Sequence, residues 1–302
     1  MNVTTAGDII NRAAVEVGLS PVSDPYSSTD PNIVQMRYLL DSLGREIVHT
    51  RKWNLLRRER VFTTVAGQAY YPLPEDFHEM LNQTWWNRTN RLPVGGPLSP
   101  QEWQYLKARL VGVVFNVLFR PQQGMIELYP DTNTPGGYEI AFEYQSEWWV
   151  KNPVGAWAGS TTYLRGTVVS NDGNAYVCQT AGTSASSGGP TGTDIQIADG
   201  SCIWDFVSTM DYLIATSDEP TDSDSIIVFD PLLMIRGLKL AFMKAKGFDT
   251  TALQQDFNRT LDSVKGHDSP APTLSASARG IGGLWDPLIG GQSVPITGFG
   301  GT

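Results

Sequence analysis

The residue types that most often carry catalysis or bind metals are sparse in this chain. Its three histidines, His49, His78 and His267, lie far apart in the sequence, and it has only two cysteines, Cys178 and Cys202. No zinc-binding histidine pair, paired-cysteine motif or Gly-x-Ser-x-Gly nucleophile elbow occurs. We therefore expect a protein that is not an enzyme and that holds neither a metal nor a cofactor.

Two groups of carboxylates are the remaining candidates for chemistry. Glu75 and Asp76 are adjacent after a Leu-Pro dipeptide, a context that is typical of a solvated turn. The acidic residues between 218 and 224 could hold a hard cation through oxygen ligands, but such a run is more often a surface loop. We expect the surface loop for the second group, which comprises Asp218, Glu219, Asp222 and Asp224.

Composition and charge limit the class of protein. The chain has 302 residues, of which 41% are hydrophobic and 18% charged, so it can bury a core and form two domains. A net charge of −9 argues against a general nucleic-acid binder but permits a protein past which DNA slides. No apolar run approaches the roughly 20 residues of a membrane span, and no signal peptide is apparent, so we expect a cytoplasmic start.

Residues 30–60 predict a long helix that leads into a strand. Asp30 can cap the first turn and Pro31 suits the first helical position, after which apolar residues recur at helical spacing. Asp230-Pro231 repeats this device ahead of a helix that is apolar on several faces. Such a helix must be contacted on several sides, by its own bundle or by neighbouring subunits.

The whole pattern predicts an α+β fold with four parts. The two chain ends, residues 1–60 and 209–266, form a helical bundle. Residues 61–150 form an inserted antiparallel β domain, in which a capping box at 99–102 starts a helix. Residues 151–208 form a second, small all-β insertion. Residues 267–302 form an extended arm, and its apolar residues within a Gly-, Ser- and Pro-rich segment indicate docking on another surface.

The small insertion leaves two questions open. Cys178 and Cys202 either form a bridge that staples a small core or remain two buried free thiols. Three aromatic residues either form a platform for a sugar ring, such as a host surface glycan, or pack in the core. These residues are Tyr163, Tyr176 and Trp204.

Several short motifs in order resemble one family. They are VEVGL at 15–19, Trp53 with a leucine pair, FTT at 62–64, GQ at 67–68, YPLPEDF at 71–77 and LS at 98–99. Their order resembles the head-to-tail adaptor (tail tubular protein A-like) family of short-tailed bacteriophages, over residues 1–150 and 209–266. The insertion, with YLRGTVV at 163–169 and NAYVC at 174–178, resembles small chitin-binding-type modules.

The resemblance implies a structural connector in the virion. It implies a homo-oligomeric ring of twelve copies between a portal protein and a tail nozzle protein, assembled in the host cytoplasm, with DNA passing through the channel. The alternative is a carbohydrate-binding tail or decoration protein that acts through residues 151–208.

Two sets of residues are the candidates for contacts with a neighbouring subunit or the portal. The cluster Arg57, Arg58 and Arg60 either forms salt bridges at a solvated strand edge or meets acidic groups across a subunit boundary. The full basic set is Arg45, Arg51, Lys52, Arg57, Arg58 and Arg60. The apolar set lies in the arm and comprises Ile281, Leu284, Trp285, Leu288, Ile289 and Phe299.

Overall fold

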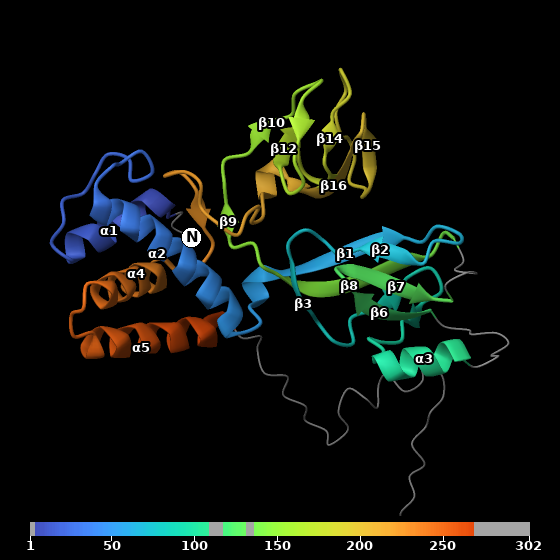
Figure 1. The fold of residues 1–302 in the computed structure, drawn as a ribbon, viewed down its shortest axis with the longest axis horizontal. Helices are drawn as coiled ribbons and strands as arrows, with labels where there is room; N and C mark the ends of the chain where they lie inside the picture. Colours follow the sequence, from blue (N-terminus) through green and yellow to red (C-terminus); the bar gives the residue numbers. More distant parts are fainter. Residues whose placement is uncertain (1–3, 109–116, 131–135, 269–302) are drawn as a thin grey trace, which may run out of the picture. The chain divides into compact units, whose positions relative to one another are not determined.

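The computed structural model of the protein describes residues 4–108, 117–130 and 136–268 (Figure 1). These residues contain five α-helices and mainly antiparallel strands, so the predicted α+β class is confirmed. They form two compact units. The first unit holds the residues up to Arg58, Pro74–Met80 and those from Tyr144 onward, and the second holds Glu59–Leu73 and Leu81–Glu143. The four-part division expected from the sequence stays a prediction.

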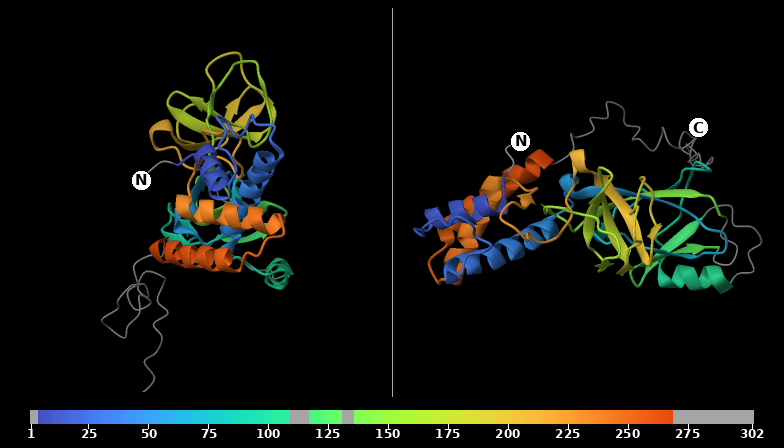
Figure 2. Two further views of the ribbon diagram at one scale, coloured as in Figure 1. Left: turned by 90° about the vertical axis from the view of Figure 1, so that its left-hand side faces the viewer. Right: turned by 90° about the horizontal axis from the view of Figure 1, so that it is seen from above.

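Four helices of the first unit lie side by side, as Figures 1 and 2 show: α1 (Ala6–Glu16), α2 (Pro31–Thr50), α4 (Pro231–Ala245) and α5 (Thr251–Asp268). The predicted caps at Asp30 and Asp230 are confirmed, because each side chain accepts a hydrogen bond from a backbone N–H of the first turn, and Thr5 caps α1 in the same way. None of the described helices has the length and hydropathy that a membrane span needs.

Helix α4 is the centre of this helical group. It contacts α1, α2 and α5, and the core that they share includes Leu233, Leu238 and Phe242. The apolar residues found on several faces of α4 are therefore buried largely within the chain itself. The apolar stripe predicted for α2 is also confirmed as buried, at Ile33, Met36, Leu40, Leu43 and Ile47.

The first unit also contains the sheet formed by the small insertion. Its strand order is β10 (Gly155–Ala156), β12 (Val168–Asn171), β13 (Asn174–Thr180), β16 (Cys202–Thr209) and β15 (Ile197–Asp199). Two shorter pairs accompany it: β11 (Thr162–Tyr163) with β14 (Gly182–Thr183), and β9 (Val150–Lys151) with β17 (Ile226–Ile227). The regular elements between residues 151 and 208 are all strands.

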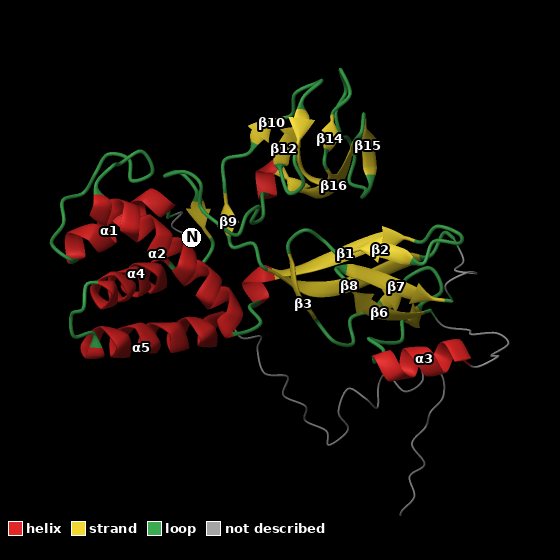
Figure 3. Cartoon of the chain, viewed as in Figure 1, coloured by secondary structure: helices red, strands yellow, loops and turns green. Residues whose placement is uncertain are grey.

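The second unit is built mainly from strands, as Figure 3 shows. One sheet has the order β1 (Arg57–Thr63), β8 (Glu139–Ser146), β4 (Trp86–Asn87) and β5 (Leu92–Pro93); β3 (Phe77–Met80) pairs with the part of β8 that belongs to the first unit. The second sheet has the order β2 (Tyr70–Pro72), β7 (Met125–Tyr129) and β6 (Leu118–Gln122). The unit boundary thus falls within β1 and β8.

Aromatic stacking fills the core of the second unit. The Trp85 ring stacks on Phe119 and Phe142, with centroid distances of 3.8 and 4.0 Å. The capping box predicted for α3 (Pro100–Ala108) is confirmed, because Ser99 and Glu102 exchange backbone-to-side-chain hydrogen bonds. Strand β4 covers only Trp86–Asn87, and Gln83, three residues before it, adopts a left-handed backbone with φ of 64°.

Close packing on α2 depends on a glycine in its middle. Gly44 lies against the indole ring of Trp149, and a Cβ atom at Gly44 would stand 2.0 Å from Trp149 Cζ2. Trp149 is fully buried. A side chain at position 44 therefore has no space unless the helix or the indole moves.

We predict that Gly44→Ala lowers the free energy of unfolding by about 1–3 kcal/mol, because the overlap with Trp149 outweighs the helix propensity of about 1 kcal/mol that alanine gains over glycine. Urea unfolding followed by circular dichroism measures the change. Gly266→Ala in α5 is the matched control, since nothing lies within 4 Å of a Cβ atom there. The control should be neutral or slightly stabilising, and an equal effect at both positions would contradict the packing argument.

Candidate partner-binding surfaces

Arg45, a candidate for contacts with a neighbouring subunit, has acidic partners in its own chain. Its guanidinium lies 3.1 Å from Asp41, 3.0 Å from Asp218 and 3.3 Å from Glu219. Two residues of the acidic run, Asp218 and Glu219, therefore pair with Arg45. Within the described part of the chain, no group of three or more His, Cys, Asp or Glu side chains could hold a metal ion.

The next two basic candidates fasten the end of α2. Arg51 donates a hydrogen bond of 2.6 Å to the carbonyl of Lys265 in α5 and lies 4.0 Å from the carboxylate of Asp268. Lys52 forms an ion pair of 2.9 Å with Glu79 of β3, and both side chains are about half exposed. Their contacts thus stabilise the first unit internally.

Arg58 forms a buried ion pair. Its guanidinium lies 2.8 Å from a carboxylate oxygen of Asp76, which also accepts a 2.8 Å hydrogen bond from the Tyr144 hydroxyl. Arg58 also donates to the Ala215 carbonyl and lies 5.4 Å over the Trp148 ring. The predicted solvated turn is wrong for Asp76, which is only 4% exposed.

The other arginines of this cluster lie in different environments. Arg57 is exposed, whereas Arg60 is buried and belongs to the second unit. Because successive side chains of a strand point to opposite faces, the three arginines do not act as a single patch. The intersubunit role of Arg57, Arg58 and Arg60 stays a prediction.

Two histidines that are distant in sequence meet in the first unit. The rings of His49 and His78 lie 4.5 Å apart, edge to face. Burial and the nearby His49 lower the pKa of His78. Sequence inspection missed this pair because it joins the end of α2 to β3, a contact that no local pattern indicates.

The three aromatic residues proposed as a sugar platform are buried. Tyr163, Tyr176 and Trp204 lie in one hydrophobic cluster, and the rings of Tyr163 and Trp204 are 5.0 Å apart. The buried carboxylate of Asp199 accepts hydrogen bonds from the indole N–H groups of Trp204 and Trp157, at 3.1 and 2.8 Å. These contacts hold the insertion together and leave none of the three rings with an open face.

Cys178 and Cys202 are both free and buried in the same cluster. Burial, together with the neighbouring Cys202, raises the pKa of the Cys178 thiol to about 11. Of the two alternatives that the sequence left open, the structure shows the free thiols, and these behave as small core residues.

A buried carboxylate organises one side of the second unit. Glu127 is 1% exposed and accepts hydrogen bonds from Arg120 at 2.6 Å and from the Tyr70 hydroxyl at 2.9 Å. Lys107 of α3 lies 3.4 Å from it. Burial opposes ionisation, but these hydrogen bonds and positive charges outweigh it and lower the pKa of Glu127. The sequence could have indicated this ion pair, because Arg120 and Glu127 stand at equal distances from the β6–β7 turn and therefore face each other across the two strands.

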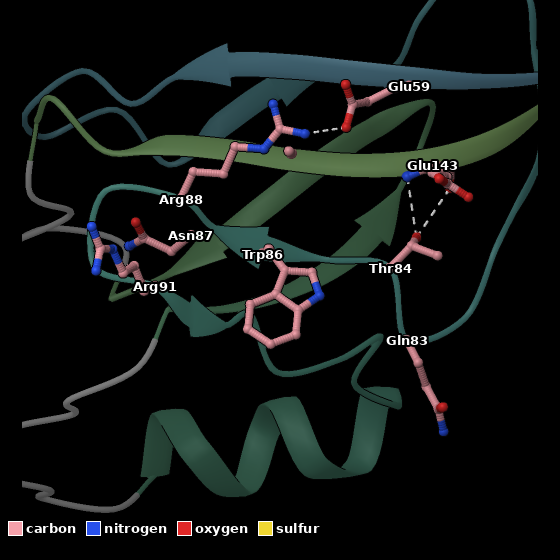
Figure 4. A pocket seen from close by; sticks show the side chains of 9 residues that line it. Glu59, Gln83, Thr84, Trp86, Asn87, Arg88, Arg91 and Glu143 are labelled. Atoms are coloured by element: carbon pink, nitrogen blue, oxygen red, sulfur yellow. Dashed lines mark hydrogen bonds and ion pairs between the residues drawn. The ribbon is translucent and has the colours of Figure 1, made fainter. Parts of the chain in front are cut away.

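An open groove of about 570 Å³ lies on the second unit (Figure 4). Side chains from β1, β4 and β8 and from the turns next to β4 line it. Figure 4 shows Trp86 in the middle of this group, with the ion pair of Arg88 and Glu59 on one side. The groove joins segments that are distant in the sequence, and its one local signal is the Trp85-Trp86 dipeptide. In the structure, Trp85 lies in the core and Trp86 is only half-buried.

The apolar candidates of the arm lie outside the described residues. They are Ile281, Leu284, Trp285, Leu288, Ile289 and Phe299. Their role as contacts stays a prediction.

The chain is a mixed α+β protein whose site residues, as far as they are described, serve packing and ion pairing. The profile of the SU10 adaptor protein family matches residues 4–168, which is more than half of the chain. No curated protein matches it.

The chain belongs to the SU10 adaptor protein family. This is a family of bacteriophage adaptors, so the protein is a structural component of a virion with partners in phage assembly, and its family implies that it is not an enzyme. The expected class, a phage adaptor, is confirmed. The narrower tail tubular protein A-like subfamily and the chitin-binding-type module remain predictions.

Removing the partner of Arg58 should be costly. We predict that Asp76→Ala lowers the free energy of unfolding by about 3–5 kcal/mol, since it leaves a buried cation without its counter-charge. Denaturant titration of the full chain measures the change. The control is Asp218→Ala, which removes a surface partner of Arg45 and should cost less than about 1 kcal/mol. Equal losses of unfolding free energy in the two variants would contradict the claim that burial makes the Arg58–Asp76 pair more important than a surface pair.

Glu127 should make stability depend on pH. Since its folded pKa is depressed, its contribution is present above its ordinary pKa of 4.5 and is lost as the pH falls through the folded value. Glu127→Gln should therefore cost about 2 kcal/mol at neutral pH, and the difference from the parent should shrink in acid. Thermal melts across a pH series test this, with the exposed Glu139→Gln as control. A difference that stays constant with pH would refute the assignment.

Proposed function

We propose that the protein forms a ring, of twelve copies, that joins the portal at the phage head to the tail nozzle. The observation that carries this proposal is the match to a phage adaptor family over residues 4–168. An adaptor must contact two different structures at once. A ring of identical copies presents one face of every subunit to each of them.

The charge of the chain supports a channel for DNA. Each copy carries a net charge of −9, which is repeated around a closed ring. Such a field repels phosphates, so DNA passes through without specific binding. The net charge bears on how the protein associates with DNA and says nothing about its fold.

The contacts between copies have to use surfaces that the chain does not cover itself. Helix α4 packs against three helices of its own unit, so its apolar faces do not require a neighbour. Two aromatic residues of the first unit remain exposed instead: Tyr38 at 69% and Phe248 at 59%. Exposed aromatic side chains are frequent in protein interfaces. Arg45 and Lys52 stay candidates because each side chain remains nearly half exposed.

A carbohydrate-binding role through residues 151–208 has less support. Trp204 and Tyr176 are completely buried, and Tyr163 is 8% exposed. A sugar ring stacks on an open aromatic face, and these side chains do not offer one in this fold.

We predict that mass photometry of the full chain with its portal shows rings of uniform mass. Tyr38→Glu should raise the protein concentration needed for ring formation at least tenfold, because it places a charge on the exposed aromatic surface that we propose as a contact between copies. The matched control is Tyr105→Glu in α3 of the second unit, where the tyrosine is 61% exposed. Circular dichroism should show that both variants keep the fold. Monomers alone, even with portal present, would refute the ring.

A further inference from the structure

The groove on the second unit combines an apolar centre with charged walls. Ala141 of β8 is 3% exposed, and its small side chain leaves space beside the half-buried indole of Trp86. The walls carry Glu59 and Glu143 together with Arg88 and Arg91. A volume of about 570 Å³ lies within the range of roughly 300–1,000 Å³ that is typical of ligand pockets.

The two arginines of the groove differ in what they contact. Arg88 pairs with Glu59 and lies 3.5 Å from Glu139, so its charge is neutralised within the chain. Arg91 has no ion-pair partner among the described residues, and its side chain is exposed. Its left-handed backbone, with φ of 56°, lies in the turn between β4 and β5. The groove therefore offers a cation at one end and an aromatic surface in its middle, which suits an apolar segment that carries a carboxylate.

The chain itself contains such a segment. Residues 269–302 follow α5, and fully extended they could reach on the order of 100 Å. Between residues 280 and 302 the segment has a single charged side chain, Asp286, and it directly follows Leu284-Trp285. An acidic residue after two large apolar ones matches the charge and the apolar surface of the groove.

We propose that the groove binds Leu284, Trp285 and Asp286 of a neighbouring copy. Asp286 pairs with Arg91, and the two apolar side chains cover Trp86 and Ala141. We assign the segment to the neighbouring copy for the following reason. If the segment of each copy binds the groove of the next copy, the contact joins two different surfaces, and repeating it closes a ring. In this respect the inference rests on the proposed function.

Peptide binding with a charge swap tests the groove. The receptor is the full chain with Trp285→Ser, so that its own segment competes less, and the probe is a fluorescent peptide of residues 279–289. Arg91→Glu should weaken the fluorescence-anisotropy affinity at least tenfold, and a peptide with Asp286→Arg should restore it on that receptor. Arg259→Glu, an exposed arginine of α5, is the control and should leave the affinity unchanged. No binding, or equal binding to the Arg91→Glu receptor, would overturn the proposal.

Mixing full-length variants tests the source of the segment. Arg91→Glu and Asp286→Arg chains should each form rings poorly, and an equal mixture should recover part of the assembly, because the altered segment of one fits the altered groove of the other. Recovery only in the double variant would overturn the neighbouring copy as the source. Rings that form without any peptide binding would overturn the groove and leave the proposed function standing. If the peptide binds and the charge swap restores binding, but no rings form, the proposed ring is refuted and the groove remains the binding site of the segment.

Discussion

An arginine that is largely withdrawn from water stays charged and therefore needs a partner, and this constraint joins four segments of the first unit. Arg58 is held by the carboxylate of Asp76, the carbonyl of Ala215 and the face of Trp148. The hydroxyl of Tyr144 occupies the other oxygen of Asp76. Four segments that are far apart in the sequence thus meet at one charge. Any arrangement of these segments that separates them leaves an uncompensated ion in the interior, which costs several kcal/mol.

The same principle separates internal charges from charges that are available to partners. Glu127 and Asp76 are buried, and each is satisfied by basic and hydroxyl groups of its own unit. Arg45 and Lys52 are paired too, but at the surface, where an ion pair is worth less than about 1 kcal/mol and can be exchanged at little cost. Burial, rather than charge alone, therefore decides which residues can contribute to assembly.

Local signals predicted the parts of the fold that local interactions determine. The caps at Asp30 and Asp230 and the box at Ser99 depend on contacts within four residues, so the sequence contains all the information needed. The burial of Asp76 and the meeting of His49 with His78 depend on contacts between distant segments. Periodicity reveals that α4 is buried on several sides, but it does not reveal which surface covers each side.

The way in which α4 is covered affects how an adaptor can be stable as a free chain and still assemble with partners. A chain that left α4 uncovered would expose a large apolar surface and aggregate before it met its partners. The structure covers α4 with α1, α2 and α5 instead. In the proposed ring, the links between copies come from small surface features, such as the groove that Arg91 and the half-buried Trp86 line. An interface built from a short segment in a groove adds affinity at each junction of a ring, and it does not require a large exposed apolar face on the free subunit.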